Sequence, residues 1–432
     1  MHLKALPGFR DFYPEDLRFR RHITEAWRRV ALRYGFEEYD GPPLEALELY
    51  TAKSGAEIVG QLYNFTDRGG REVALRPEMT PTLARMVAAR VNGLKKPVRW
   101  FSMPQLFRYE RQQRGRLREH FQLNCDLIGE SGPLADAEII ALAADVMREL
   151  GLSERDVRIR VSDRRVLTVL LGEAGVPPEH HHLAWQLLDK LGRGEYPTWR
   201  ARLLDAGVGP DVVERLEAVR AIRGFADLEG AYPLAAGAAV PLRQVFSALD
   251  RMGLGGFLDL DLTIVRGLAY YTGTVFELFD AGYSLRAICG GGRYDGLLQA
   301  IGGIDIPALG FGMGDVVLGE LLRERELLPA AGSAVDVFLA AVGPDDHEYL
   351  LGLAHRLRDA GLRVEYPLTE TAVGKQLKLA AARAARFAVV VGPDDRARGE
   401  VALKDLGSGA QESVLEATLV NTLRARLSPV SS

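Results

Sequence analysis

The sequence predicts a mixed α/β protein: a sheet-based region carries a helical insertion and is followed by a separate small α/β domain. Three observations support this prediction. Segments before residue 170 and after residue 255 mix helical spacing with short β-type runs. Residues 170–255 are instead rich in alanine and leucine, with repeated short helical patterns. After a linker-like stretch at 329–333, strands of consecutive apolar residues alternate with helices, which is typical of a mainly parallel sheet covered on both faces.

The first 150 residues predict three helices separated by β-type segments. Leu17, Ile23, Trp27 and Val30 recur at roughly helical spacing and predict a helix over 16–34. We expect the rest of this region in the following order: an extended stretch at 35–49 around Pro42, a hairpin at 62–75 with the turn Asp67-Arg-Gly-Gly, a helix at 77–92, two β arms joined by a polar loop at 97–130, and a helix at 135–150 ended by Gly151.

The remaining elements follow the same two kinds of pattern. Beyond the insertion we expect β-rich segments at 258–290, a helix near 293–301 and a glycine-rich strand-to-helix passage at 308–323. In the terminal domain the expected strands are 335–342, 363–366, 387–391 and 400–406, and the expected helices are 347–360 and 375–384. The predicted domains are therefore 1–325, with the insertion at about 170–255, and 333–432.

Composition and charge exclude several classes of protein. Charged residues make up 26% and hydrophobic residues 47% of the 432-residue chain, as in globular proteins. A net charge of -4 argues against a surface that binds polyanions everywhere, and it confines nucleic-acid binding to local basic patches. Cys125 and Cys289 lie far apart, so reduced thiols are expected, and the sequence has no apolar run of signal-peptide or membrane-spanning length. We therefore expect a cytoplasmic protein.

The polar loop between the two β arms is rich in arginine. Five arginines fall within eleven residues: Arg108, Arg111, Arg114, Arg116 and Arg118. Guanidinium groups match phosphate oxygens in a bidentate way and keep their charge at any working pH. A solvated basic hairpin tip is the alternative. Alternation along the arms favours a binding floor, because cations and carboxylates then share one face. The residues concerned are Arg108, Glu110, Gln122 and Asp126.

Two further segments carry groups that suit a small polar ligand. Glu78 and Thr80 stand at the first turn of an expected helix, where they could bind an ammonium group or cap the helix. The stretch from Arg266 to Glu277 contains paired tyrosines, and Gly290-Gly-Gly follows closely. Such a set can hold a polar ligand and let a phosphate approach the backbone. The structural alternatives are a β-bulge, a close strand crossing and half-buried sheet tyrosines.

Together these motifs resemble a class II aminoacyl-tRNA synthetase and, within that class, the histidyl-tRNA synthetase family. The resemblance runs from about residue 5 to 425 and rests on the following segments: 35–44 around Pro42 for the first class motif, Phe107-Arg-Tyr-Glu-Arg through Gln122 for the second, Pro307-Ala-Leu-Gly-Phe-Gly-Met-Gly for the third, and Arg266-Gly-Leu-Ala-Tyr-Tyr-Thr and Gly290-Gly-Gly-Arg-Tyr-Asp-Gly for the two histidine-specific motifs. It implies a catalytic domain with an antiparallel sheet flanked by helices, a helical insertion and a C-terminal α/β anticodon-binding domain.

The resemblance also implies a reaction. The carboxylate of histidine would attack the α-phosphorus of ATP, assisted by Mg²⁺, and histidine would then pass from the adenylate to the 3′ end of tRNA(His). Arg266 and Arg108 would be the catalytic residues. The other implied roles are ATP binding by Arg108, Glu110 and Arg116, contact with the histidine ammonium by Glu78, Thr80, Gln122 and Asp126, contact with its imidazole by Tyr271 and Tyr294, and contact with its carboxylate by Arg266.

The sequence departs from the family pattern at several positions. The third motif usually ends in Glu-Arg with the arginine over ATP, and here Val317 stands in place of that arginine. Ala269 replaces a usual aspartate in the first histidine motif. In the second motif Gln112 stands where proline is common, and His120 precedes phenylalanine in reversed order. These loop changes predict altered reading of the tRNA acceptor end. For ATP, either another cation has replaced the missing arginine or the nucleotide is no longer used.

Loss of ATP use would fit an alternative function, a non-catalytic relative similar to the regulatory subunit of ATP phosphoribosyltransferase in histidine biosynthesis. That subunit commonly lacks the terminal domain, and this chain keeps both the domain and Arg266, so the sequence favours the enzyme. A synthetase for another amino acid fits the core but not the tyrosine motifs. The family further implies a homodimer and tRNA contacts by the terminal domain, where Lys375, Lys378, Arg383 and Arg386 could meet phosphates.

Overall fold

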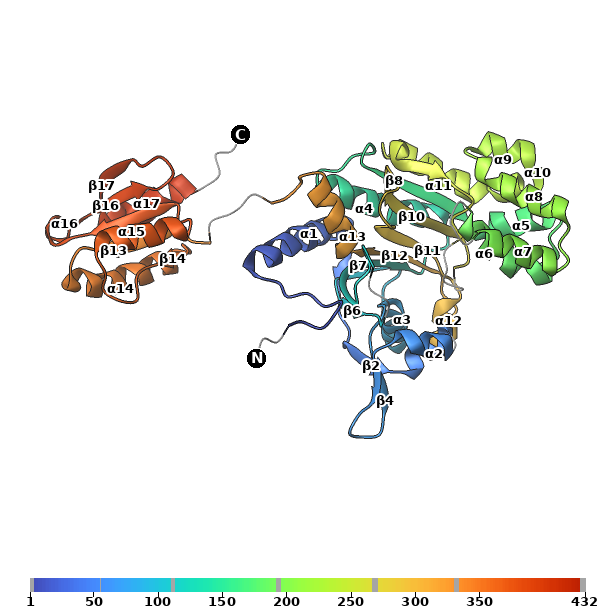
Figure 1. Cartoon of the computed structure of the whole chain (residues 1–432), viewed down its shortest axis with the longest axis horizontal. Coiled ribbons are helices and arrows are strands. Elements are labelled where there is room, and N and C mark those ends of the chain that lie inside the picture. Colours follow the sequence, from blue (N-terminus) through green and yellow to red (C-terminus); the bar gives the residue numbers. More distant parts are fainter. Residues whose placement is uncertain are drawn as a thin grey trace. The chain divides into compact units, whose positions relative to one another are not determined.

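The computed structural model describes residues 4–54, 56–109, 113–191, 196–265, 271–329 and 334–427. The chain divides into two compact units, Met1–Leu328 and Pro329–Ser432 (Figure 1). Both units mix helices with sheets, so the predicted fold class is confirmed. Within these described ranges, no helix is long and apolar enough to cross a membrane.

The first unit is built on a large sheet, nine-stranded in the part of the chain that is described. Its strands follow in the order β1 (Glu37–Glu38), β5 (Val98–Ser102), β7 (Glu119–Ile128), β12 (Ala308–Gly314), β11 (Cys289–Arg293), β10 (Thr274–Asp280), β8 (Val157–Asp163) and β9 (Leu258–Leu260), with β6 (Gln105–Phe107) also paired to β7. Neighbours are antiparallel from β5 to β8, and the pairs β1–β5 and β8–β9 are parallel. Strand β8 was not predicted, although its alternating buried residues are typical of a strand.

Most of the other predicted elements of the first half are present. The three predicted helices are α1 (Pro14–Arg33), α3 (Thr80–Arg90) and α4 (Pro133–Glu149), and α2 (Glu48–Ser54) was not predicted. A small sheet joins β2 (Leu44–Ala46), β4 (Glu72–Leu75) and β3 (Asn64–Thr66). The predicted hairpin turn forms between β3 and β4. The Asp67 carboxylate accepts the backbone N–H of Gly69 at 2.8 Å and that of Arg71 at 2.9 Å, which fixes the turn.

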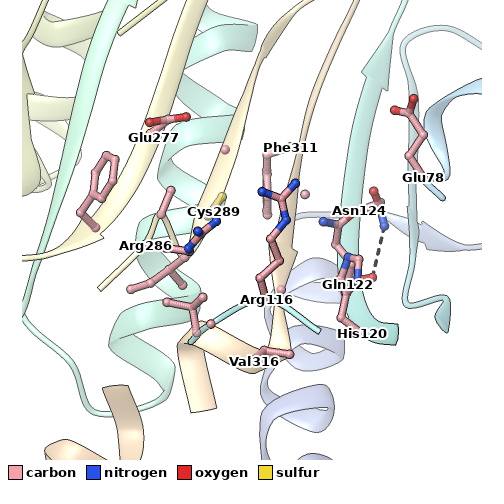
Figure 2. Close-up of a pocket in the computed structure, with 18 of the residues that line it drawn as sticks. Glu78, Arg116, His120, Gln122, Asn124, Glu277, Arg286, Cys289, Phe311 and Val316 are labelled. Carbon is pink, nitrogen blue, oxygen red and sulfur yellow. Dashed lines mark hydrogen bonds between the residues drawn. The ribbon is translucent and has the colours of Figure 1, made fainter. Parts of the chain in front are cut away.

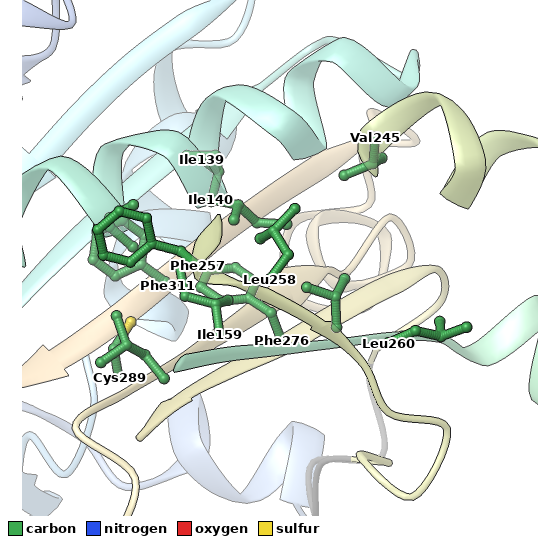
Figure 3. Close-up of a cluster of buried hydrophobic side chains, with 14 of the residues drawn as sticks. Ile139, Ile140, Ile159, Val245, Phe257, Leu258, Leu260, Phe276, Cys289 and Phe311 are labelled. Atoms are coloured by element: carbon green, nitrogen blue, oxygen red, sulfur yellow. The ribbon is translucent and has the colours of Figure 1, made fainter. Parts of the chain in front are cut away.

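The main core of the first unit lies on one face of the large sheet, and a smaller buried cluster that includes Val275 and Leu298 lies on the other. Leu123, Cys125 and Leu127 alternate along β7 and pack in one cluster with Trp27 of α1 and Ile140 of α4. Figure 3 shows part of this cluster, where side chains of α4 and of the helix at 240–251 meet Ile159, Phe276 and Phe311 of the sheet. The same strands present their other residues to the opposite face, where the candidate site lies.

The predicted helical insertion is present and begins slightly earlier than expected. It contains α5 (Arg164–Ala174), α6 (His181–Lys190), α7 (Tyr196–Asp205), α8 (Pro210–Ala218), α9 (Phe225–Ala231), α10 (Pro233–Ala238) and α11 (Val240–Arg251) (Figure 1). Asp163 caps α5 by accepting the Arg165 N–H at 2.8 Å, and Gly175 ends it in the left-handed conformation. The chain then returns to the sheet, where α12 (Leu297–Gly302) follows β11 and α13 (Asp315–Glu324) follows β12.

The second unit holds a five-stranded sheet in the order β14 (Val364–Glu365), β13 (Val337–Ala341), β15 (Phe387–Val391), β16 (Glu400–Asp405) and β17 (Gln411–Leu415). The expectation of a mainly parallel sheet is corrected here, because β16 and β17 pair antiparallel. Only residues 392–399, including α16 (Pro393–Arg398), join β15 to β16. A parallel crossover needs a dozen residues or more, so this short connection enforces the antiparallel pairing.

Helices cover both faces of the terminal sheet, as the sequence predicted. On one face Leu339 packs with Leu353 of α14 (Pro344–Asp359) and with Leu419 of α17 (Glu416–Leu427). On the other face Phe338 packs with Ala380 of α15 (Val373–Ala382). Helices α16 and α17 and strand β17 were not predicted.

Candidate active site

The candidate site is a pocket of about 1190 Å³ on the face of the large sheet opposite the main core. Strands β7, β10, β11 and β12 form its floor, and the arginine-rich hairpin between β6 and β7 lies along one side. Figure 2 shows side chains from these elements converging on the same space, with Glu78 reaching it from the segment before α3. The pocket therefore joins residues that are far apart in the sequence.

Strand β7 supplies a row of polar side chains to the pocket. His120, Gln122, Asn124 and Asp126 alternate with the core residues of the same strand, because successive side chains point to opposite faces. This alternation confirms that Gln122 and Asp126 share one face, and it adds two residues that the sequence reasoning missed, His120 and Asn124. The amide of Asn124 donates to the Gln122 carbonyl at 3.2 Å.

The glycines of β12 make room for this row. Gly310 is paired with Asp126 and Gly312 with Asn124, next to Gln122. A Cβ added at Gly310 would lie 2.3 Å from Asp126 Oδ1, and one at Gly312 would lie 2.7 Å from Gln122 Cδ. Real Cβ atoms do not approach other atoms so closely. The glycine spacing of the third motif therefore follows from the side chains on the neighbouring strand.

The triple glycine of β11 has mixed roles. Gly290 lines the pocket. A Cβ at Gly291 would lie 2.4 Å from the Gly310 carbonyl, and one at Gly292 would lie 2.5 Å from the Thr274 carbonyl. Close strand packing, the structural alternative raised for this motif, therefore explains these two glycines. Arg293 of the same motif points away and pairs with Asp136 at 2.7 Å, with both side chains buried.

The two predicted tyrosines lie in one buried cluster that borders the pocket. Tyr271 is 7% and Tyr294 3% exposed, and both line the pocket. The Tyr294 hydroxyl donates a hydrogen bond to Asp126 Oδ1. Burial raises the pKa of Asp126 to about 7, and the bond from Tyr294 opposes this rise. The carboxyl therefore sits close to its titration point near neutral pH.

Glu78 and Thr80 both line the pocket at the start of α3. The N-cap of this helix is Met79, which makes no side-chain capping bond, so the capping alternative does not describe the helix start. Arg76 positions the segment, because its guanidinium donates to Asp40 Oδ1 and to the Gly41 carbonyl, each at 2.7 Å. The preceding strand is thereby tied to the chain near the first class motif.

The arginines of the hairpin divide into two groups. Arg108 and Arg116 line the pocket, and the Arg108 side chain donates to the Pro77 carbonyl at 3.0 Å. Arg114 instead pairs with Glu320 at 3.2 Å and Glu324 at 2.7 Å on α13. Arg118 lies over the Tyr109 ring at 4.6 Å. Among the described arginines of the hairpin, Arg108 and Arg116 thus form the predicted basic surface of the pocket. Glu110 and Arg111 lie outside the described residues.

The reversed pair at 120 and 121 has a structural consequence. His120 faces the pocket, while Phe121 faces α1, where the Arg20 guanidinium lies 4.2 Å from its ring centre. Burial, followed by the charges of Arg108 and other arginines, lowers the pKa of His120 to about 3. The imidazole is therefore neutral at physiological pH and can both donate and accept a hydrogen bond.

The third motif contributes one structural anchor. Asp315, at the start of α13, accepts the Phe121 N–H at 2.9 Å and pairs with Arg10 at 2.9 Å. Arg10 also pairs with the buried Glu119 at 2.6 Å. This network fixes the base of the arginine-rich hairpin against α13. Val317 lines the pocket at the position where the family arginine was expected.

Further pocket residues carried no signal in the sequence reasoning. They are Glu277 and Phe279 of β10, Arg286 between β10 and β11, and Asp189 and Lys190 at the end of α6. Alternation from the predicted strand at 258–290 could have marked Glu277, but the others depend on how loops and the insertion fold back. Arg266 lies outside the described residues, and its role stays a prediction from the sequence.

Comparison with known proteins agrees with this geometry. Residues 8–314 match the family model "Histidyl-tRNA synthetase", and residues 336–426 match the model "Anticodon binding domain". The chain is 45% identical to the histidine–tRNA ligase of Opitutus terrae over 95% of both chains. It is 42% identical to the chloroplastic/mitochondrial histidine–tRNA ligase of Arabidopsis thaliana, over 94% of this chain and 84% of that one. The histidyl-tRNA synthetase structure from Nostoc sp. PCC 7120 matches with a TM-score of 0.83 and 26% identity, covering 99% of this chain and 100% of the other.

A mainly antiparallel sheet that brings the second and third class motifs together at one pocket defines a class II aminoacyl-tRNA synthetase, an ATP-dependent ligase. The chain belongs to the histidyl-tRNA synthetase family. The matches to histidine–tRNA ligases extend over nearly the whole chain, which supports the enzyme and not the regulatory-subunit alternative.

Proposed function

We propose that the pocket activates histidine with ATP, giving histidyl-adenylate and pyrophosphate, and then transfers histidine to the 3′ end of tRNA(His), with the residue roles given below. One observation carries this proposal. A single pocket of about 1190 Å³ brings the guanidinium groups of Arg108 and Arg116 together with a buried carboxyl–tyrosine pair, Asp126 and Tyr294. The first pair suits phosphates, and the second suits a polar side chain such as imidazole.

The amino-acid end of the pocket has two subsites in this proposal. Glu78, Thr80 and Gln122 surround the ammonium group of histidine, because they meet at the start of α3 and on β7. Tyr271 and Tyr294 hold the imidazole. Since Tyr294 donates to Asp126, we assign Asp126 to the imidazole subsite and not to the ammonium group. A buried carboxylate there accepts an N–H and rejects side chains that lack one.

The phosphate end neutralises the charge that develops during transfer. A carboxylate oxygen of histidine attacks the α-phosphorus of ATP, the new carboxyl–phosphate bond forms, and the bond to the bridging oxygen of pyrophosphate breaks. The nucleophile is already ionised, so positioning and charge neutralisation dominate the chemistry. We assign Arg108 and Arg266 to the α-phosphate, Arg116 to the outer phosphates, and Glu110 to the adenine side.

Mg²⁺ fits this site as an ion that enters with ATP. Among the described residues, no group of three or more His, Cys, Asp or Glu side chains is arranged to hold a metal ion. Mg²⁺ commonly binds through substrate phosphates, waters and one or two carboxylates, and Glu277 lines the same pocket. When bound, the ion would neutralise phosphate charge.

For the second unit we propose binding of the tRNA anticodon. Lys375, Lys378, Arg383 and Arg386 are exposed on or just after α15, where they are available to phosphates. We also propose a homodimer, in which the segment around Pro42 contributes to the interface, and sedimentation velocity tests that state. The cytoplasmic location stays a prediction from the sequence.

One pair of assays tests the proposed function. Purified protein should catalyse histidine-dependent ATP–pyrophosphate exchange and should then charge a tRNA(His) transcript. If histidine supports no pyrophosphate exchange, the proposal is contradicted and the regulatory alternative is favoured. If another amino acid supports the exchange, the enzyme is specific for that amino acid and not for histidine. Exchange without charging would leave the first step in place and contradict the transfer step.

A further inference from the structure

The wall of the pocket near the third motif has an unusual composition. Val317, on the first turn of α13, is 8% exposed and lines the pocket with Val316 and Gly115. An aliphatic side chain cannot bind a nucleotide phosphate. In a site that binds a triphosphate through guanidinium groups, a cation is therefore missing from this wall unless another element supplies it.

Arg286 reaches the same wall from a different element. It belongs to the connection between β10 and β11, whereas Val317 belongs to α13. A Cβ added at Gly115 would lie 3.2 Å from Val317 Cγ2 and 3.6 Å from Arg286 Cδ. The stem of Arg286 and the side chain of Val317 therefore converge on one spot beside the hairpin loop. Figure 2 shows the Arg286 side chain in the pocket together with Arg116 and Val316.

The guanidinium of Arg286 is held by a neutral group. Its Nη2 donates a hydrogen bond to Oε1 of Gln113, on the arginine-rich hairpin. An amide acceptor orients the guanidinium but does not neutralise its charge. The bond also links the β10–β11 connection to the loop that carries Arg116.

Arg286 acts electrostatically on the pocket. Burial lowers the pKa of Arg116, and the charges of Arg286 and Arg108 lower it further. The charges of Arg286 and Arg108 thus raise the electrostatic cost of the charged Arg116 guanidinium, and all three side chains line one concave space. An anion with several oxygens removes that cost, since each guanidinium can donate two parallel hydrogen bonds to phosphate.

We propose that Arg286 binds the triphosphate of ATP and supplies, from the β10–β11 connection, the cation that position 317 does not provide. This inference rests on the proposed function, because it names a nucleotide contact within the same site. In this proposal the two positions compensate for each other. Arg286 places a guanidinium beside Val317, where valine itself provides no charge.

Arg286→Ala tests this contact by its effect on ATP. Hydrogen bonds to charged groups contribute about 1.5–3 kcal/mol, so the KM for ATP should rise about 10–100-fold in pyrophosphate exchange. The KM for histidine should change less than about threefold on the same scale. Arg286→Lys should recover part of the loss, because it keeps the charge but not the fork. Arg114→Ala is the control arginine, since Arg114 lies next to Gln113 on the hairpin that Arg286 contacts but pairs with Glu320 and Glu324.

The compensation between positions 286 and 317 is tested by placing an arginine at position 317 in a variant that lacks Arg286. Val317→Arg in the Arg286→Ala background should restore most of the ATP affinity, whereas Val317→Lys should restore less. A purely structural role, in which Arg286 only holds the loop through Gln113, predicts the opposite pattern. In that case Gln113→Ala would match the effect of Arg286→Ala, and arginine at 317 would rescue nothing.

Direct binding separates this inference from the proposed function. MgATP binding is measured by titration calorimetry on the full chain, with thermal unfolding as the check that each variant is folded. An unchanged MgATP affinity in folded Arg286→Ala overturns the inference, whatever the activity of the wild type. Wild-type protein that binds MgATP but shows no histidine-dependent exchange overturns the proposed function. The ratio of the MgATP dissociation constants of Arg286→Ala and wild type still decides the role of Arg286.

Discussion

The paired strands β7 and β12 carry different kinds of side chain on their two faces. On the core face, Leu123, Cys125 and Leu127 of β7 pack beside Phe311 and Met313 of β12. On the pocket face, the polar row from His120 to Asp126 lies against the glycines of the neighbouring strand. The core face needs volume and the pocket face needs empty space, so large apolar residues and glycines alternate along β12.

The difference teaches where stability and function reside in this sheet. Buried apolar side chains stabilise the fold by removing area from water, whereas a buried carboxyl such as Asp126 is costly unless it is hydrogen-bonded. The Tyr294 hydroxyl offsets part of that cost. Substitutions on the two faces should therefore separate: those on the pocket face change kinetics, and those on the core face change unfolding.

The largest kinetic effect is expected on the pocket face at Arg108. Arg108→Ala should lower kcat/KM for histidine-dependent pyrophosphate exchange by roughly 10²–10³-fold, as for other groups that stabilise developing charge. Its free energy of unfolding should stay within about 0.5–1 kcal/mol of wild type, since the side chain is partly exposed. Arg114→Ala should leave exchange unchanged. Equal activity of the two variants would contradict the division of the hairpin arginines.

On the core face, Leu127→Ala should show the reverse behaviour. The Leu127 side chain is 1% exposed in the main cluster, and removal of a buried leucine costs about 2–5 kcal/mol through lost burial and the cavity left behind. Chemical denaturation measures this loss. Exchange kinetics below the unfolding temperature should stay close to wild type, and a kinetic loss as large as that of Arg108→Ala would break the separation between the faces.

A smaller effect is expected from Tyr294→Phe, which removes one hydroxyl and keeps the ring. Without its donor, Asp126 is left with a less favourable charged form, and one partner of the imidazole subsite is lost. We expect the KM for histidine to rise about 10-fold, with little change in the KM for ATP. An effect on ATP alone would remove Tyr294 from the amino-acid subsite.

The smallest effect is expected in the pH dependence of stability. Burial raises the pKa of Asp126 to about 7, so the folded protein keeps a proton that the unfolded chain releases near pH 4. The contribution of this carboxyl to the free energy of unfolding is therefore fully present below about pH 4 and is lost as the pH rises towards about 7. Asp126→Asn does not titrate.

Urea denaturation across that pH range compares the two proteins. The free energy of unfolding of the wild type minus that of Asp126→Asn should fall as the pH rises from about 4 to 7. A difference that stays constant, or that grows with pH, would show that the Asp126 carboxyl is ionised throughout and would contradict its raised pKa.

Much of the fold followed from local patterns. Helical spacing placed α1, α3 and α4, and turn residues placed the β3–β4 hairpin. Strand β8 was missed because it lies directly between a strong helix and the insertion, and β17 because its residues are mostly exposed. In the terminal sheet the expected parallel pairing holds for β13 with β14 and β15, but it was wrong for β16 and β17, because a run of apolar residues indicates burial and does not give the direction of the neighbouring strand.

For the site, the motifs selected Arg108, Arg116, Gln122, Asp126, Tyr271 and Tyr294, all of which line one pocket. His120 and Asn124 could have been found by extending the same period of two along β7. Arg286 could not, because its position depends on the path of the connection between β10 and β11. A residue on such a connection has no periodic signal that relates it to a distant wall.

The sequence by itself determined which positions carry charged side chains, which carry glycine and which carry apolar residues for the core, since spacing and residue chemistry are local properties. The tertiary structure decided how they combine. Antiparallel pairing of β7 with β12 set the glycines against the polar row, and the fold of the β10–β11 connection brought Arg286 to the side of Val317. These contacts join positions far apart in the chain, and only packing in three dimensions specifies them.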